Sequence, residues 1–178
     1  SCRPRLMSTP TSAAARRVGR TSLTRILSEI PRDLAATVVA AIHTGEPRSR
    51  RAAALLAEQT ALQVSDAEEG SELLQGHVYL APAGTHLVVR DNQRLGFDEG
   101  PELRSVRPAA DRLFISAARV LRQRVIGVVL TGHGRDGTAG LTEIHKWGGV
   151  GVVQSPGEAQ ATQMPIHAIQ DDDPDYIA

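Results

Sequence analysis

The feature that most constrains the fold is a six-residue run, 125–130 (VIGVVL), that leads directly into a glycine-rich loop. A short apolar run bounded by turn residues is typical of a strand buried on both faces of a parallel sheet. The loop 131–137 (TGHGRDG) follows, and residues 138–146 then have the pattern of a helix. A strand, a glycine-rich loop and a helix in this order indicate an α/β fold.

The rest of the chain repeats this alternation of apolar runs and helical patterns. Apolar runs predict further strands at 37–42, 63–65, 78–80 and 150–153. Helices are expected at 23–30, 50–62, 108–120 and 166–170. Residues 87–89, followed by turn residues at 91–94, predict an antiparallel hairpin. We therefore expect an α/β fold in which helices flank a mostly parallel sheet and an antiparallel hairpin is added to it.

The composition excludes several classes of protein. Of the 178 residues, 41% are hydrophobic and 22% are charged, which is ordinary for a single globular domain. No apolar run approaches the roughly 20 residues of a membrane-spanning helix, so no membrane insertion is expected. The single cysteine, Cys2, excludes a disulfide framework, and aromatic residues at 3% disfavour base stacking on nucleic acid. There is no apolar stretch typical of a secretory signal, so a cytoplasmic location is expected.

The first residues differ in composition from the rest of the chain. Residues 1–25 contain six arginines and no acidic residue, and no apolar periodicity precedes Leu23. We expect residues 1–20 to form an atypical, flexible basic arm and residues 21–178 to form the folded domain. The arm could instead contact nucleic acid or a membrane surface, or it could be a transit peptide. Nothing else in the sequence supports these alternatives.

Two predicted strands end in residues that can carry chemistry. The strand at 37–42 leads to His43, and the strand at 125–130 leads to the loop that contains Asp136. The carboxyl ends of parallel strands meet at one edge of the sheet, where α/β proteins place their sites. An imidazole oriented by a carboxylate is the base half of a catalytic triad, and glycines 132, 134 and 137 would let backbone N–H groups face an oxyanion. A loop or capping role for His43 is the structural alternative.

The same glycines also fit the dinucleotide fingerprint G-x-G-x-x-G. Asp136 lies inside this motif, where it would face the phosphates, and the acidic residue expected about 20 positions later would have to be Glu158. We therefore expect no dinucleotide and no other cofactor.

A metal site can be judged from the six histidines, which lie at positions 43, 77, 86, 133, 145 and 167. None of them forms H-E-x-x-H, and no pair has close helical spacing together with a carboxylate. No metal is therefore expected. His133 is predicted to be a solvated loop residue, and His145 is predicted to interact with the dipole at a helix end.

Several segments together resemble the catalytic domain of the chemotaxis protein-glutamate methylesterase (CheB) family. They are 38–45 (VVAAIHTG), 76–82 (GHVYLAP), 107–118 (RPAADRLFISAA), 125–137 (VIGVVLTGHGRDG) and 148–154, followed by Met164-Pro165. The resemblance implies a doubly wound α/β fold and a Ser-His-Asp triad in which His43 and Asp136 match the histidine and the aspartate. It also implies hydrolysis of glutamyl methyl esters on the cytoplasmic helices of chemoreceptors, and deamidation of certain receptor glutamines.

The nucleophile departs from the family pattern, which has a G-A-S-x-G-G type turn after an apolar first strand. Counting back from His43 without gaps places the serine at Arg16, and the nearest hydroxyls are Ser12 and Ser22. Ser12 requires a four-residue shift and is our candidate nucleophile, whereas Ser22 would lie inside the predicted helix. Either the chain is a degenerate family member, or its first 20 or so residues have been replaced, for example through an altered reading frame or start.

These observations lead to a functional expectation with one alternative. We expect a methylesterase that lacks the usual nucleophile turn and has very weak or no activity. The alternative is a catalytically dead binding module of the same fold in a chemosensory signalling complex. Without an apolar first strand, one edge of the sheet is expected to be bare, and self-association is the expected compensation.

Overall fold

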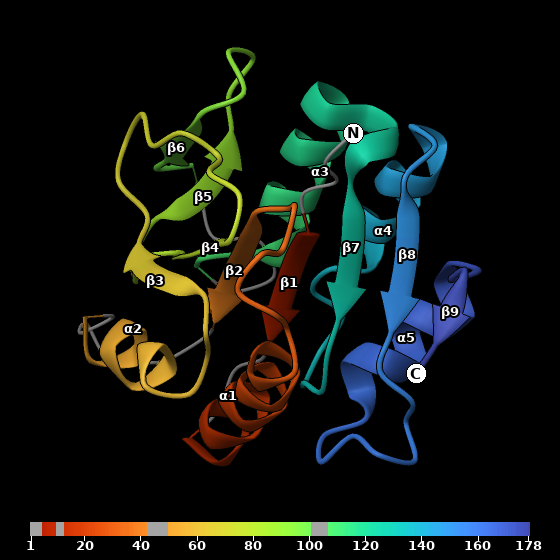
Figure 1. The fold of residues 1–178 in the computed structure, drawn as a ribbon. Coiled ribbons are helices and arrows are strands. Elements are labelled where there is room, and N and C mark those ends of the chain that lie inside the picture. Colours follow the sequence, from red (N-terminus) through yellow and green to blue (C-terminus); the bar gives the residue numbers. More distant parts are fainter. Residues whose placement is uncertain (1–4, 10–12, 43–49, 101–106) are drawn as a thin grey trace.

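A seven-stranded parallel sheet forms the centre of the molecule (Figure 1). The computed structural model describes residues 5–9, 13–42, 50–100 and 107–178. The strands of the main sheet are β1 (Arg5–Thr9), β2 (Val38–Ile42), β3 (Gln63–Asp66), β4 (His77–Leu80), β7 (Ile126–Val129), β8 (Val150–Val153) and β9 (Tyr176–Ile177). Their order across the sheet is β3-β4-β2-β1-β7-β8-β9, and every neighbouring pair is parallel. The predicted α/β fold with a mostly parallel sheet is confirmed.

Helices cover both faces of this sheet (Figure 1). They are α1 (Ala13–Ser28), α2 (Arg50–Ala57), α3 (Ala110–Leu121), α4 (Thr138–Lys146) and α5 (Gln163–Asp171), with a short 3₁₀ turn, η1 (Arg122–Arg124), after α3. Within the described ranges, no helix is long and apolar enough to cross a membrane.

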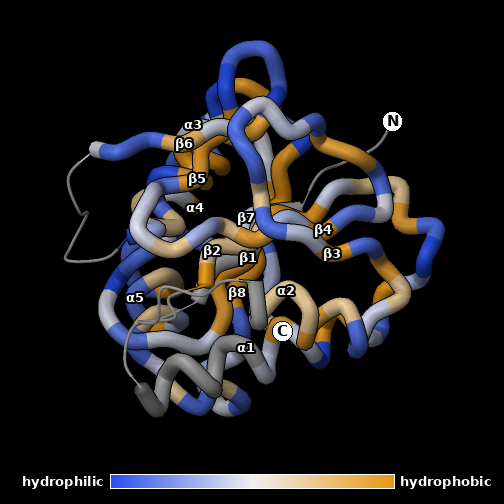
Figure 2. Tube along the Cα trace, turned by 90° about the vertical axis from the view of Figure 1, so that its left-hand side faces the viewer, coloured by the Kyte–Doolittle hydropathy of each residue, from blue (hydrophilic) through white to orange (hydrophobic). Residues whose placement is uncertain are grey.

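The alternation of side chains along β2 divides the core into two clusters. Val38, Ala40 and Ile42 pack with Leu23 and Leu27 of α1 and with residues of α2. Val39 and Ala41 point to the other face and belong to the cluster that contains residues of α3, α4 and α5. Because β2 is buried on both faces, it needs an unbroken apolar run, and Figure 2 shows hydrophobic residues along the central strands.

Most predicted elements agree with the structure, and their ends differ by a few residues. The helix predicted at 138–146 and the strand predicted at 150–153 have the bounds of α4 and β8. The helix predicted at 50–62 ends earlier, at Ala57, and the last helix begins earlier, at Gln163.

The elements at the beginning of the chain differ from those expected. Instead of an arm without regular structure, residues 5–9 form β1, and α1 begins at Ala13 rather than near Leu23. β1 lies between β2 and β7 and pairs with both, so it belongs to the centre of the sheet and not to an edge. Backbone pairing on both sides forms a strand here although the sequence lacks an apolar run. The expected bare edge is therefore absent, and the self-association inferred from it loses its basis.

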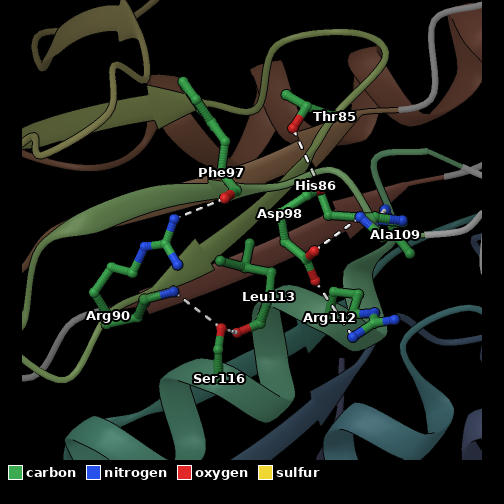
Figure 3. A network of polar contacts seen from close by, with 11 residues as sticks. Thr85, His86, Arg90, Phe97, Asp98, Ala109, Arg112, Leu113 and Ser116 are labelled. Carbon is green, nitrogen blue, oxygen red and sulfur yellow. Dashed lines mark hydrogen bonds and ion pairs between the residues drawn. The ribbon is translucent and has the colours of Figure 1, made fainter.

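The predicted hairpin forms a separate small sheet. β5 (His86–Val89) and β6 (Leu95–Asp98) pair antiparallel with each other and lie beside α3. Ser116 in α3 accepts a hydrogen bond from the amide of Val89 at 3.0 Å, and Arg112 forms an ion pair with Asp98 at 3.3 Å. These contacts, part of the network in Figure 3, attach the small sheet to α3.

Candidate active site

The carboxyl ends of β2, β1 and β7 meet at one edge of the main sheet. Thr9 pairs with Ile42, and Ser8 pairs with Val129, so the three strands end at nearly the same level. His43 directly follows β2, and residues 10–12, including Ser12, connect β1 to α1. Both His43 and Ser12 lie outside the described residues. Asp136 belongs to the loop that follows β7.

The strands that precede His43 and Asp136 are not adjacent in the sheet, because β1 lies between β2 and β7. Their ends are therefore about 10 Å apart, two strand spacings, rather than one.

Asp136 is a member of the predicted triad that lies within the described residues. Its side chain is buried, with 5% of the residue exposed. Its two carboxylate oxygens accept the amides of Ala110, at 2.7 Å, and Asp111, at 3.0 Å. These are the first two residues of α3, whose amides lack partners within the helix and whose dipole favours a negative charge. The carboxylate is thus held in one orientation by two charge-assisted hydrogen bonds.

The first turn of α4 is also capped by a carboxylate, which comes from α3. The carboxylate of Asp111, a residue that is 4% exposed, accepts the amide of Gly140 at 2.8 Å. Gly140 is the third residue of α4, and the residue before α4 is Gly137, which has no side chain to cap it. Asp136 therefore caps α3, and Asp111 of α3 caps α4. Sequence analysis missed this exchange, although the acidic residue three places after Pro108, at a predicted helix start, was a visible signal.

The glycine-rich loop is bound to the segment that leads into α5. The amide of Gly132 donates to the carbonyl of Ala161 at 2.8 Å, and the amide of Gly134 donates to Oε1 of Gln163 at 2.9 Å. The imidazole Nδ1 of His167 lies 2.9 Å from the carbonyl oxygen of Gly134. These contacts correct the prediction that Gly132 and Gly134 would direct their amides to an oxyanion, because both amides already have acceptors within the protein.

The remaining glycine and the neighbouring histidine have simpler roles. Gly137 has a φ of +91°, in the left-handed region that favours glycine, and directly precedes α4. His133 is exposed to solvent, as predicted. Among the residues that the structure describes, no cluster of three or more His, Cys, Asp or Glu side chains could hold a metal ion.

The contacts of α4 also bear on the dinucleotide alternative. In a dinucleotide site, the pyrophosphate would accept amides at the start of the helix that follows the glycine-rich loop. Here the carboxylate of Asp111 accepts the amide of Gly140, and that of Asp136 lies buried beside it. Two carboxylates at this position oppose a bound phosphate.

The comparisons with known proteins agree with this architecture. The family model described as CheB methylesterase matches residues 15–178. The chain belongs to the CheB methylesterase family. It is 39% identical over 151 residues to the protein-glutamate methylesterase FrzG of Myxococcus xanthus, covering 85% of this chain and 45% of that protein. It is 35% identical over 167 residues to a protein-glutamate methylesterase/protein-glutamine glutaminase of Pyrococcus horikoshii, covering 92% of this chain and 45% of that protein.

A solved structure extends the match to nearly the whole chain. The catalytic domain of Thermotoga maritima CheB methylesterase superposes with a TM-score of 0.91 at 28% sequence identity, covering 99% of this chain and 92% of that one. The chain thus has the length of a CheB catalytic domain, while it spans 45% of the length of the two curated relatives above.

The structure also bears on the position of the nucleophile. The gapless count from His43 places the family serine at Arg16, but residue 16 lies within α1. The connection that follows β1 instead contains Pro10, Thr11 and Ser12. In hydrolases of this general type, the nucleophile occupies a sharp turn between a strand and a helix. Ser22 also lies within α1.

Proposed function

We propose that the chain is a hydrolase of glutamyl methyl esters, with Ser12 as nucleophile, His43 as base and Asp136 as the carboxylate that orients His43. One observation carries this proposal: the Asp136 carboxylate is buried and held by two amides at the edge where β1 and β2 end. We further infer that the substrates are methylated glutamates of proteins, as in the names of the relatives. The resemblance to the family implies that these glutamates lie on the cytoplasmic helices of chemoreceptors.

In the proposed reaction, the Ser12 hydroxyl attacks the γ-carbonyl carbon of the ester while His43 takes its proton. The ester C–O bond then breaks, and His43 returns the proton to the leaving methanol. Water, deprotonated by His43, hydrolyses the acyl-enzyme, so that the glutamate carboxylate and free Ser12 are restored. Asp136 holds the imidazole in one tautomer and stabilises the imidazolium. The amides at the start of α1, from Ala13 onward, are the proposed oxyanion donors, because the first amides of a helix lack intrahelical acceptors.

We expect turnover to be slow. A nucleophile elbow is a strained turn that normally uses glycine on both sides of the serine. The sequence around Ser12 is Pro10-Thr11-Ser12-Ala13-Ala14, which has no glycine. The hydroxyl is therefore expected to adopt the attacking geometry only part of the time, which reduces kcat more than substrate binding.

The deciding experiment measures methanol release from a methylated receptor. The wild-type chain is compared with Ser12→Ala, His43→Ala and Asp136→Asn, and Ser22→Ala serves as the matched hydroxyl control in α1. Slow release that is abolished by Ser12→Ala and His43→Ala, strongly reduced by Asp136→Asn and unchanged by Ser22→Ala is the expected result. Turnover that requires His43 but not Ser12 would reject Ser12 as the nucleophile.

A second function is favoured by the gapless sequence count, which puts Arg16 in the place of the family serine. Loss of a nucleophile costs on the order of 10⁶ in rate, as much as loss of the whole triad. On this reading, the domain binds receptor helices without hydrolysing them. A silent wild-type chain that co-sediments with receptor, and that gains methanol release from Arg16→Ser, would favour this second function and place the ancestral nucleophile at position 16.

A further inference from the structure

We propose that Asp111 is a positioning residue for Asp136, and through it for the hydrolysis proposed above, on which this inference rests. Asp111 lies in α3, and α4 begins two residues after Asp136. Asp111 would therefore act on Asp136 through the placement of α4 relative to α3.

The first step of the argument is the direct link between the two residues. The amide of Asp111 donates to Oδ1 of Asp136 at 3.0 Å, and the neighbouring amide of Ala110 donates to Oδ2 at 2.7 Å. The orientation of the Asp136 carboxylate is thus set by where α3 begins. The preceding amide, of Ala109, donates to Nδ1 of the fully buried His86 at 3.0 Å (Figure 3). The start of α3 is therefore fixed by side chains from two different segments.

The second step is the return contact from α3 to α4. The Asp111 carboxylate accepts the amide of Gly140 at 2.8 Å. This contact needs a close approach of the helices, which the missing side chain of Gly140 allows. A Cβ at position 140 would lie 2.4 Å from the Cβ of Phe114, a residue of α3 that is completely buried. Asp111 thus ties the first turn of α4 to the first turn of α3.

The third step connects this contact to the position of Asp136. Only Gly137 separates Asp136 from the first residue of α4, so a shift of this helix end moves the Asp136 backbone. Removing the Asp111 carboxylate would leave the Gly140 amide without its acceptor and weaken the connection between the helices. The Asp136 carboxylate would then lose its alignment with the α3 amides, and a misplacement of about 1 Å can cost about 10²-fold in rate.

The test compares Asp111→Ala with Asp111→Asn, which keeps an acceptor oxygen for Gly140. Ser116→Ala is the matched control. It also removes from α3 a side chain that accepts a backbone amide, but this amide belongs to Val89 of β5 and not to α4. We expect Asp111→Ala to lower kcat by about 10²-fold with little change in KM. Asp111→Asn is expected to retain most of the activity, and Ser116→Ala to leave kcat per folded molecule unchanged. The double variant Asp111→Ala/Asp136→Ala should be no slower than Asp136→Ala alone, because Asp111 acts through Asp136.

Amide hydrogen exchange provides a readout that does not depend on activity. In Asp111→Ala, the amide of Gly140 should exchange faster because its acceptor is gone. The amide of Ala110, whose acceptor is Asp136, should also exchange about tenfold faster, as for loss of one hydrogen bond. An unchanged Ala110 amide, or losses in kcat that multiply in the double variant, would overturn the proposal and leave Asp111 a local cap. If the wild-type chain releases no methanol, the proposed hydrolysis fails, and exchange at Ala110 alone decides whether Asp111 positions Asp136.

Discussion

The Nε2 atom of His145, near the end of α4, lies 2.9 Å from a carboxylate oxygen of Asp175, just before β9. The other ring nitrogen contacts Asp172 at 3.0 Å, and Asp175 also accepts the amide of Gly151 at 2.7 Å. His145 was predicted to interact only with the helix dipole, whereas it joins α4 to the C-terminal segment.

The first prediction is a pH-dependent contribution of His145 to stability. Burial lowers the pKa of His145, but hydrogen bonds to Asp175 and Asp172 outweigh burial and raise the pKa above 6.5. The stabilisation is therefore fully present below pH 6.5 and is lost as the pH rises through the raised pKa. The Gly151 amide lowers the pKa of Asp175 below 3.8, so its contribution is present above that pH and is lost as the pH falls through the lowered pKa.

We expect His145→Gln to lower the free energy of unfolding by about 0.5–1 kcal/mol near pH 5, since Asp175 is 44% exposed and solvent screens the pair. The difference should shrink as the pH rises through the raised pKa of His145. Urea unfolding near pH 5 and at a pH above that pKa measures it. An equal difference at both pH values would show that packing, rather than charge, accounts for the loss.

The second prediction concerns the close approach of α3 and α4. Replacing glycine by alanine inside a helix normally favours the helix by about 1 kcal/mol. In Gly140→Ala, the clash with the Cβ of Phe114 should reverse this sign and destabilise the protein by about 1–3 kcal/mol. Gly157→Ala, in a turn, is the control for an added Cβ that has room, because the nearest atom to that Cβ is 3.7 Å away. Thermal unfolding measures both variants, and a stabilised Gly140→Ala would contradict the close approach.

The third prediction concerns the attachment of the small sheet. Ser116→Ala removes the acceptor of the Val89 amide. Val89 is buried, with 4% of the residue exposed. An unsatisfied buried amide costs about 1–3 kcal/mol, and the free energy of unfolding should fall by that amount. Ser71→Ala is the control, since Ser71 accepts the amide of Glu68 at an exposed position where water can replace it. Equal losses in the two variants would argue against a buried role for Ser116.

The fourth prediction is that the glycine-rich loop binds no dinucleotide. The Asp111 carboxylate accepts the Gly140 amide, and a phosphate at the start of α4 would have to displace it. Calorimetric titration of the protein with NAD should show no saturable heat of binding. Saturable binding that is lost in Gly134→Val would support the dinucleotide alternative instead.

Much of the fold could be predicted because short apolar runs and glycine-rich turns act over a few residues. The strand before the glycine-rich loop, α4 and β8 were all recognised from such local patterns. The pattern failed for β1, because a strand paired on both sides is held by backbone hydrogen bonds that any residue but proline can make.

The sequence by itself determined the α/β class, the buried strands and the presence of Asp136 after one of them, since burial on both faces of a sheet requires an unbroken apolar run. Tertiary structure alone decided that β1 separates β2 from β7 and that the amides of Gly132 and Gly134 already have acceptors. It also decided that Asp136 caps α3 while Asp111 of α3 caps α4. These hydrogen bonds join donors and acceptors that lie 25 to 29 residues apart along the chain and meet only when the sheet has brought α3, α4 and α5 onto one face.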